Sequence, residues 1–143
     1  MNVNKAIVLG NVTRDPEIRS LPSGQNVASF GVATNRYWTD KTSGEKKSQV
    51  EFHNISAFGR LAEIAQQFLK KGSLVYIEGR LQTRSWQDQQ GNKRSRTDII
   101  AERLQLGPRR APSAPSGEAP ETEIEETPQP QGEEEINVEE IPF

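Results

Sequence analysis

The segment RLAEIAQQFLKKG, residues 60–72, decides the fold class, because it alone in the folded part of the sequence has a helical hydrophobic period. Its apolar residues recur at the spacing i, i+3, i+4, i+7 of a single helical stripe: Leu61, Ile64, Ala65 and Phe68. Two lysines and then Gly72 follow, which is typical of a helix C-terminus. We therefore expect one short helix that ends before Gly72.

Strand patterns surround this helix. Five segments are rich in β-branched and aromatic residues: 4–12, 26–34 and 49–58 before the helix, and 73–84 and 96–106 after it. Five strands with one helix between the third and the fourth follow the order of the OB-fold. The sequence therefore predicts an all-β protein with a five-stranded Greek-key barrel and one short helix.

Glycines support a curved sheet. Gly10, Gly31 and Gly79 lie inside predicted strands, where they suit the bulges and bends that curl a small sheet into a barrel. The segment DQQGNKR, residues 88–94, predicts the tip of a long hairpin between the last two strands.

The charge is divided unequally along the 143 residues. The net charge is −2, from 18 Lys and Arg and 20 Asp and Glu. Residues 1–110 hold all 18 basic residues and 10 acidic ones, a net charge of +8, whereas residues 111–143 hold the other 10 acidic residues, a net charge of −10. This division indicates a basic body that meets a polyanion and an acidic tail with a separate role.

The composition changes near residue 107. Residues 1–107 carry the strand and helix patterns, residues 108–132 are rich in Pro and Glu, and residues 133–143 are acidic. A segment with so few apolar residues cannot offset its ordering entropy, so we expect residues 108–132 to be a disordered linker. The chain has no cysteine, no apolar run of membrane-spanning length and no secretory signal pattern, so we expect a cytoplasmic protein.

Few residues could support catalysis or bind a metal. His53 is the only histidine, so the sequence cannot build a histidine-based metal cluster or a serine–histidine triad. A single histidine in a strand is usually a packed or interface residue. The segment RDPEIR, residues 14–19, is typical of a turn with local ion pairs. We predict a protein that is not an enzyme and needs no metal or other cofactor.

Aromatic residues in basic surroundings carry the functional signal. Alternation along residues 49–58 places Phe52 and Phe58 on one face with two small polar residues, although burial of both rings in the core stays open at this point. Trp38 and Trp86 each lie in a polar, basic segment that we expect to be a loop. Exposed rings stack on unpaired bases, with about 1–3 kcal/mol per base, while cations contact phosphates. The pattern predicts binding of single-stranded nucleic acid, with these basic residues near the rings: Lys41, Lys46, Lys47, Arg60, Lys70, Lys71, Arg84 and Arg94.

Four stretches together resemble the bacterial single-stranded DNA-binding protein family: NKAIVLGNVTRDPEIR, ATNRYWTDKTSGEKK, EFHNISAFGRLAEIAQQFLKKGSLVYIEGRLQTRSWQDQQG and the terminal EEIPF. The resemblance covers residues 3–107 and then the last few. It implies an OB-fold homotetramer that wraps and protects single-stranded DNA in replication, recombination and repair. It also implies stacking by Trp38, Phe52, Phe58 and Trp86, and phosphate contacts from Lys5, Lys41, Lys47, Arg60, Lys70, Lys71 and Arg84.

The sequence departs from this family at several implied DNA contacts. Phe52 stands where relatives have tryptophan, so its stacking area is smaller. Some relatives have basic residues at three positions that are polar here, namely Asn54, Gln82 and Ser85. The resemblance places His53 near a subunit interface.

The resemblance also assigns a role to the last five residues as a docking peptide for replication, recombination and repair proteins: Glu139, Glu140, Ile141, Pro142 and Phe143. A terminal carboxylate can pair with a basic residue of a partner, while the phenyl ring fills an apolar pocket and the glutamates speed encounter. A purely solubilising tail would explain the glutamates but not the apolar tip. The tail's charge also suggests that it competes with DNA for the basic body.

Two other functions stay open from the sequence. One is an OB-fold RNA-binding chaperone, and the other is a primosomal adaptor that uses the barrel for protein contacts.

Overall fold

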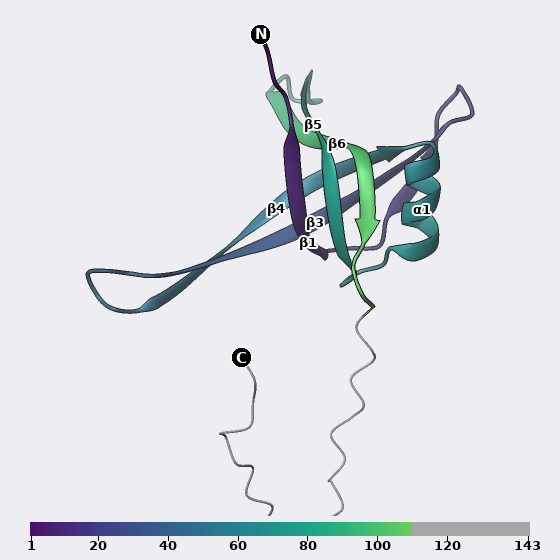
Figure 1. The fold of residues 1–143 in the computed structure, drawn as a ribbon. Helices are drawn as coiled ribbons and strands as arrows, with labels where there is room; N and C mark the ends of the chain where they lie inside the picture. The colour runs from purple at the N-terminus through teal and green to yellow at the C-terminus, as the bar shows by residue number, and fades with distance from the viewer. Residues whose placement is uncertain (110–143) are drawn as a thin grey trace, which may run out of the picture. The chain divides into compact units, whose positions relative to one another are not determined.

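The computed structural model describes residues 1–109, so residues 110–132 of the predicted linker and the whole docking peptide lie outside the described residues. The elements follow in the order β1 (Ala6–Val12), β2 (Glu17–Ser20), β3 (Asn26–Thr39), β4 (Lys46–Phe58), α1 (Arg60–Phe68), β5 (Leu74–Gln87) and β6 (Lys93–Leu106). Figure 1 shows the strands wrapped around one another, with α1 beside them and β3 and β4 extending outward as a long hairpin. Within residues 1–109, no helix has the length and apolar character needed to cross a membrane.

Hydrogen bonding closes five of the strands into a barrel. The sheet order is β1-β5-β6-β4-β3, and β1 also pairs with β3, so the first strand joins the two ends of the sheet. The pairing of β4 with β6 is parallel and places Ile55 opposite Ile99, whereas the other barrel pairings are antiparallel. The short β2 pairs with β3 alone. The predicted five-stranded OB-fold barrel, with its helix between the third and fourth barrel strands, is confirmed.

The core fills the barrel with side chains from alternate strand positions. The predicted alternation in β3 is confirmed, because Ala28, Phe30 and Val32 are all fully buried. Ile55 of β4 and Ile77 of β5 are fully buried as well. Each large apolar side chain in this core contributes about 1.5–3 kcal/mol relative to an exposed one.

Helix α1 packs on β3, β4 and β6 through its small residues. Ala62 and Ala65 are fully buried, and Leu69 just after the helix is buried as well. The Leu69 amide donates a hydrogen bond to the Ala65 carbonyl. Phe68 is exposed, so the buried side differs from the predicted stripe. Alanines let the helix axis approach the barrel closely, and the large ring of Phe68 remains at the edge of the contact.

Two of the predicted bend glycines lie where another strand's backbone comes very close. A Cβ atom at Gly10 would overlap the carbonyl oxygen of Ala33, and one at Gly79 would overlap that of Ile100. Gly79 also borders a shift in the pairing of β5 with β6, which leaves Glu102 without a direct partner residue. These glycines permit the close approach and the bulge that a small barrel requires.

Three segments differ from the sequence prediction. The predicted turn at residues 14–19 contributes to strand β2, although the expected local ion pair is present, with 4.0 Å between Arg19 and Glu17. Trp38 and Trp86, expected in loops, lie on β3 and β5. Both strands continue into exposed two-stranded hairpins, which we call the β3–β4 arm (residues 35–50) and the β5–β6 arm (residues 82–97).

Candidate nucleic-acid interface

The outer side of β4 carries two of the predicted aromatic residues. Successive side chains of a strand point to opposite faces, and paired residues point to the same face. Ile55 and Ala57 are fully buried in the barrel, so alternation directs Phe52 and Phe58 outward, as the sequence predicts.

Strand pairing continues this outer side across β6 and β5. Asn54, two residues from Phe52, is paired with Asp98, and Asp98 is paired with Gln82. Alternation along β5 from Gln82 then places Arg84 and Trp86 outward. We call this side of the three strands the outer face, and its members are Phe52, Asn54, Ser56, Phe58, Gln82, Arg84, Trp86, Arg94, Arg96 and Asp98, of which Ser56 and Asp98 are buried.

All three rings of the outer face are accessible. Phe52 is 72% exposed, Trp86 49% and Phe58 37%, so the alternative in which both phenylalanines are buried is wrong. Three accessible rings on one side of the sheet, on the same side as several arginines, form a candidate contact surface.

Trp38 lies on the reverse face of the β3–β4 arm. The residue pairs that contain Phe52 and Tyr37 alternate with the pair of Trp38 and Lys47, so the side that carries Phe52 continues to Tyr37. Trp38 is 39% exposed, and the guanidinium carbon of Arg36 is 5.6 Å from the centre of its ring, within cation–π range. The four predicted aromatic residues are therefore all accessible, but they do not share one face.

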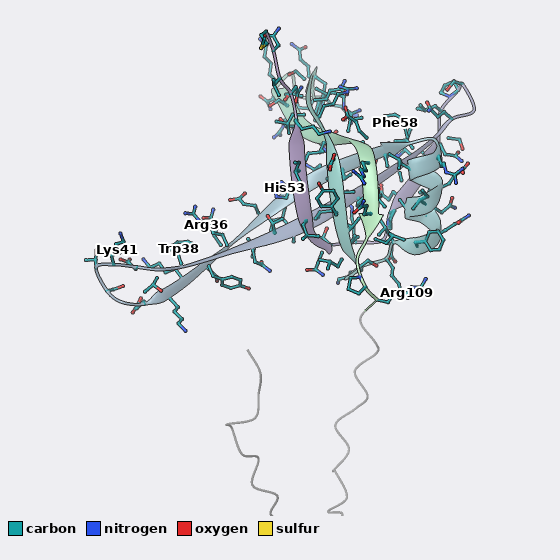
Figure 2. All side chains as sticks on the ribbon, viewed as in Figure 1. Arg36, Trp38, Lys41, His53, Phe58 and Arg109 are labelled. Atoms are coloured by element: carbon teal, nitrogen blue, oxygen red, sulfur yellow. The ribbon has the colours of Figure 1, made fainter. Side chains whose placement is uncertain are left out.

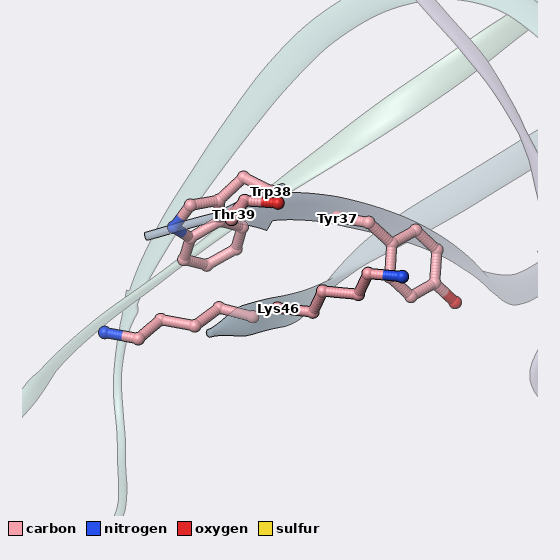
Figure 3. Close-up of a pocket in the computed structure, with 5 residues that line it drawn as sticks. Tyr37, Trp38, Thr39 and Lys46 are labelled. Carbon is pink, nitrogen blue, oxygen red and sulfur yellow. The ribbon is translucent and has the colours of Figure 1, made fainter. Parts of the chain in front are cut away.

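Each tryptophan lies directly opposite a basic residue. Trp38 is paired with Lys47, and Trp86 is paired with Arg94. Each pair also contributes to the lining of a shallow hollow, of about 390 Å³ for the first pair and about 420 Å³ for the second. Figure 3 shows the first hollow, which is lined by Tyr37, Trp38, Thr39, Lys46 and Lys47. A ring beside a cation provides the contacts that an unpaired base and its phosphate need.

A buried carboxylate fixes two arginines on the outer face. Asp98 is 1% exposed, with its Oδ2 atom 2.7 Å from Nη2 of Arg84 and its Oδ1 atom 2.7 Å from Nε of Arg96. Burial acts to raise the pKa of Asp98, but hydrogen bonds and charge from both guanidinium groups hold it below its ordinary value. Each guanidinium carries five N–H donors, so donors remain for a phosphate.

Comparison with known proteins agrees with this arrangement. Residues 3–107 match the model of the single-strand binding protein family. The chain belongs to this family. Membership confirms the family resemblance predicted from the sequence.

Two solved structures from the single-strand binding protein family are similar to this chain. A Plasmodium falciparum SSB in complex with ssDNA has a TM-score of 0.72 at 31% identity, covering 76% of this chain and 97% of that chain. A deletion mutant of the single-stranded DNA binding protein from Thermus aquaticus has a TM-score of 0.65 at 29% identity, covering 74% of this chain and 51% of that one.

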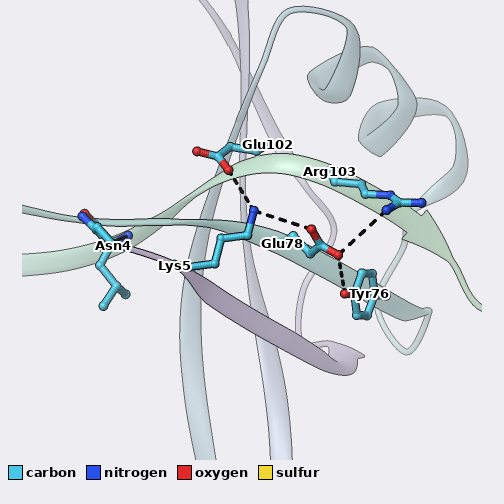
Figure 4. Close-up of polar contacts among 7 residues, drawn as sticks. Asn4, Lys5, Tyr76, Glu78, Glu102 and Arg103 are labelled. Carbon is cyan, nitrogen blue, oxygen red and sulfur yellow. Dashed lines mark hydrogen bonds and ion pairs between the residues drawn. The ribbon is translucent and has the colours of Figure 1, made fainter. Parts of the chain in front are cut away.

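Three of the basic residues implied by the family are engaged in ion pairs. Nζ of Lys47 is 2.7 Å from Asp40, and Arg84 binds Asp98. Nζ of Lys5 lies 3.1 Å from Glu102 and 3.5 Å from Glu78, within a polar network that includes Tyr76 and Arg103 (Figure 4). The hydrogen bond to Glu102 is the main cause that raises the pKa of Lys5. Two carboxylates already bind the Lys5 ammonium group, so Lys5 is less available to a phosphate than an unpaired lysine.

The other four basic residues implied by the family are exposed: Lys41, Arg60, Lys70 and Lys71. Their side chains form no ion pair within residues 1–109. Figure 2 shows Lys41 at the tip of the β3–β4 arm, beyond Trp38, with Phe58 at the far side of the barrel. Arg60 begins α1, two residues after Phe58, whereas the two lysines follow the other end of the helix. These cations are distributed around the barrel rather than clustered.

His53 has a structural partner. Its Nε2 atom is 2.9 Å from the hydroxyl of Thr34 on the neighbouring strand, and the ring is half-buried. This contact agrees with a packed histidine.

Arg36 and Tyr37 are not among the site residues predicted from the sequence. Both lie on the β3–β4 arm, Arg36 against Trp38 and Tyr37 on the opposite side of the arm. The signal was present in the adjacent pair of rings, because neighbours in a strand point to opposite faces. The polar, basic composition of this segment, which indicates a loop, obscures that signal.

Proposed function

We propose that this protein binds single-stranded DNA without sequence preference. Bases stack on Phe52, Phe58 and Trp86 of the outer face and on Trp38 of the arm. The observation that carries the proposal is the alignment of accessible rings with Arg84, Arg94 and Arg96 on one face across three strands. The Plasmodium falciparum relative, solved with ssDNA, supports this ligand class. No reacting group is required, so the proposed function is not enzymatic.

The phosphates contact the exposed cations in this proposal. Lys41, Arg60, Lys70 and Lys71 have no competing carboxylate within residues 1–109, so they are the foremost contacts. Lys5, Lys47 and Arg84 also contribute where DNA displaces or shares their ion pairs. Affinity therefore falls with salt, at a log–log slope of about −0.7 per phosphate neutralised.

The proposed assembly is a homotetramer. Ile7 and Leu9 point outward from β1 and are more than half exposed, next to the polar network around Lys5. Adjacent exposed aliphatic side chains on a strand favour contact with another copy. Light scattering tests the assembly, with Ile7→Asp expected to lower the molar mass.

The proposed cellular role is protection of unwound strands in the cytoplasm during replication, recombination and repair. Residues 139–143 recruit enzymes of these processes as a docking peptide, a proposal that rests on the acidic and apolar sequence at this end.

Fluorescence anisotropy with a labelled oligo(dT) tests the ligand directly. Unlabelled single-stranded DNA, matched RNA and matched duplex DNA compete in parallel. The proposal predicts displacement by single-stranded DNA at far lower concentration than by duplex, whose bases are already stacked on one another. Preference for RNA would support the RNA chaperone instead. Absence of oligo(dT) binding would contradict the proposal and favour the adaptor.

A further inference from the structure

Tyr37 is the most exposed aromatic ring within residues 1–109, at 75%. Its hydroxyl forms no hydrogen bond to a side chain in this described part of the chain, and the ring lines the hollow of the β3–β4 arm (Figure 3). A largely exposed ring held on a strand offers a flat apolar surface at little entropic cost, because the strand already fixes its backbone.

Tyr37 extends the side of the sheet that carries Phe52. Phe52 is paired with Ala33, and Tyr37 lies four residues further along the same strand, about 13 Å away at about 3.3 Å per residue. Trp38 points to the reverse face, where Arg36 lies over its ring. Tyr37 is therefore the ring through which the outer face continues onto this arm.

A cation accompanies Tyr37 on the same side. Lys46 is paired with Thr39, two residues from Tyr37, so alternation places both side chains on one face. Lys46 is exposed and forms no ion pair within residues 1–109, whereas Lys47 on the reverse face is bound to Asp40. This face of the β3–β4 arm thus combines an exposed ring with an unpaired positive charge. The ring can stack on an unpaired base, and the charge can contact its phosphate.

We propose that Tyr37 is a further base-stacking residue, with Lys46 contacting the adjacent phosphate. This inference rests on the proposed function and adds a contact to it. The β3–β4 arm then presents one ring to DNA on each of its faces. Tyr37 lies on one face, and Trp38, with Arg36 over its ring, lies on the other.

The test compares full-length variants by anisotropy with oligo(dT). Tyr37→Ala should weaken binding about 5- to 150-fold, the range expected for loss of one stacked base. Tyr37→Phe keeps the ring and should bind like the wild type. Phe68→Ala, which removes an exposed ring on α1 to which no base contact is assigned, is the matched control and should also bind like the wild type.

Three results would overturn the inference. Wild-type affinity of Tyr37→Ala, with weakened binding by Trp86→Ala, would reject Tyr37 while leaving the proposed function intact. A changed molar mass of Tyr37→Ala in light scattering would assign the ring to a subunit contact. Failure of the wild type itself to bind oligo(dT) would reject the proposed function and the inference together.

Discussion

Removal of both arginines that flank Asp98 is expected to destabilise the barrel far more than removal of either one. Hydrogen bonds to charged groups contribute about 1.5–3 kcal/mol each. The side chains of Arg84 and Arg96 are 65% and 39% exposed, so solvent screening reduces this to about 1–2 kcal/mol for either arginine changed to Met. The double variant leaves the buried Asp98 carboxylate unpaired, and we expect a loss of about 3–5 kcal/mol.

The stability lost in the double variant should depend on pH. Burial acts to raise the pKa of Asp98, but the two arginines lower it in the native protein. A carboxyl group whose pKa is lowered by folding stabilises the native protein at pH values above its unfolded pKa, which is 3.8 for Asp98. This stabilisation is lost as the pH falls through the folded pKa. In the double variant only burial remains, so the folded pKa is raised and the penalty fades as acid protonates the carboxyl group. The difference between wild type and double variant should therefore shrink toward acid pH.

Urea unfolding of the full-length protein, followed by far-UV circular dichroism at pH 7 and pH 4, measures both effects. Protein concentration must be fixed, because assembly makes apparent stability concentration-dependent. Arg80→Met is the matched control. Arg80 is exposed, lies on β5 as Arg84 does, and forms no ion pair within residues 1–109. A double variant within about 1 kcal/mol of wild type at pH 7, or a difference that is as large at pH 4 as at pH 7, would refute the role assigned to the cluster.

Three further predictions concern DNA binding and the barrel. Phe52→Trp enlarges the most exposed ring of the outer face and should lower the Kd for oligo(dT); an unchanged Kd would mean that no base stacks there. Gly79→Ala forces a methyl group against the carbonyl oxygen of Ile100. It should lower the free energy of unfolding, measured in urea, by about 1–3 kcal/mol. A variant as stable as the wild type would show that the bulge relaxes easily. Deletion of residues 133–143 removes five glutamates and should tighten DNA binding at low salt but not at high salt; equal affinity at low salt would contradict tail competition.

The buried parts of the fold could be predicted because burial leaves a periodic pattern. Ala28, Phe30 and Val32 alternate in the sequence because every second side chain enters the core. The arms have solvent on both faces, so their strands lack this alternation, and the sequence predicts loops around Trp38 and Trp86. The sequence places Phe68 in the buried stripe because hydrophobic spacing does not reveal that alanines form the closer contact.

The site could be predicted as a set of residue types but not as a surface. The aromatic and basic residues were visible in the sequence, and the exposure of Phe52 and Phe58 follows from strand alternation. Their grouping depends on long-range register, such as the pairing of Asp98 with both Asn54 and Gln82, which no local pattern encodes. For the same reason, the position of Trp38 on the reverse face and the ion pairs of Lys5 became apparent only in the structure.

Intrinsic tryptophan fluorescence during titration tests most directly whether unpaired bases stack on the exposed rings. Wild type, Trp38→Phe and Trp86→Phe are titrated with poly(dT) and, separately, with duplex DNA of equal nucleotide concentration, so that each indole is observed alone. Stacking predicts strong quenching by poly(dT) for both indoles and little quenching by duplex. Equal quenching by the duplex, or none by poly(dT), would contradict the account.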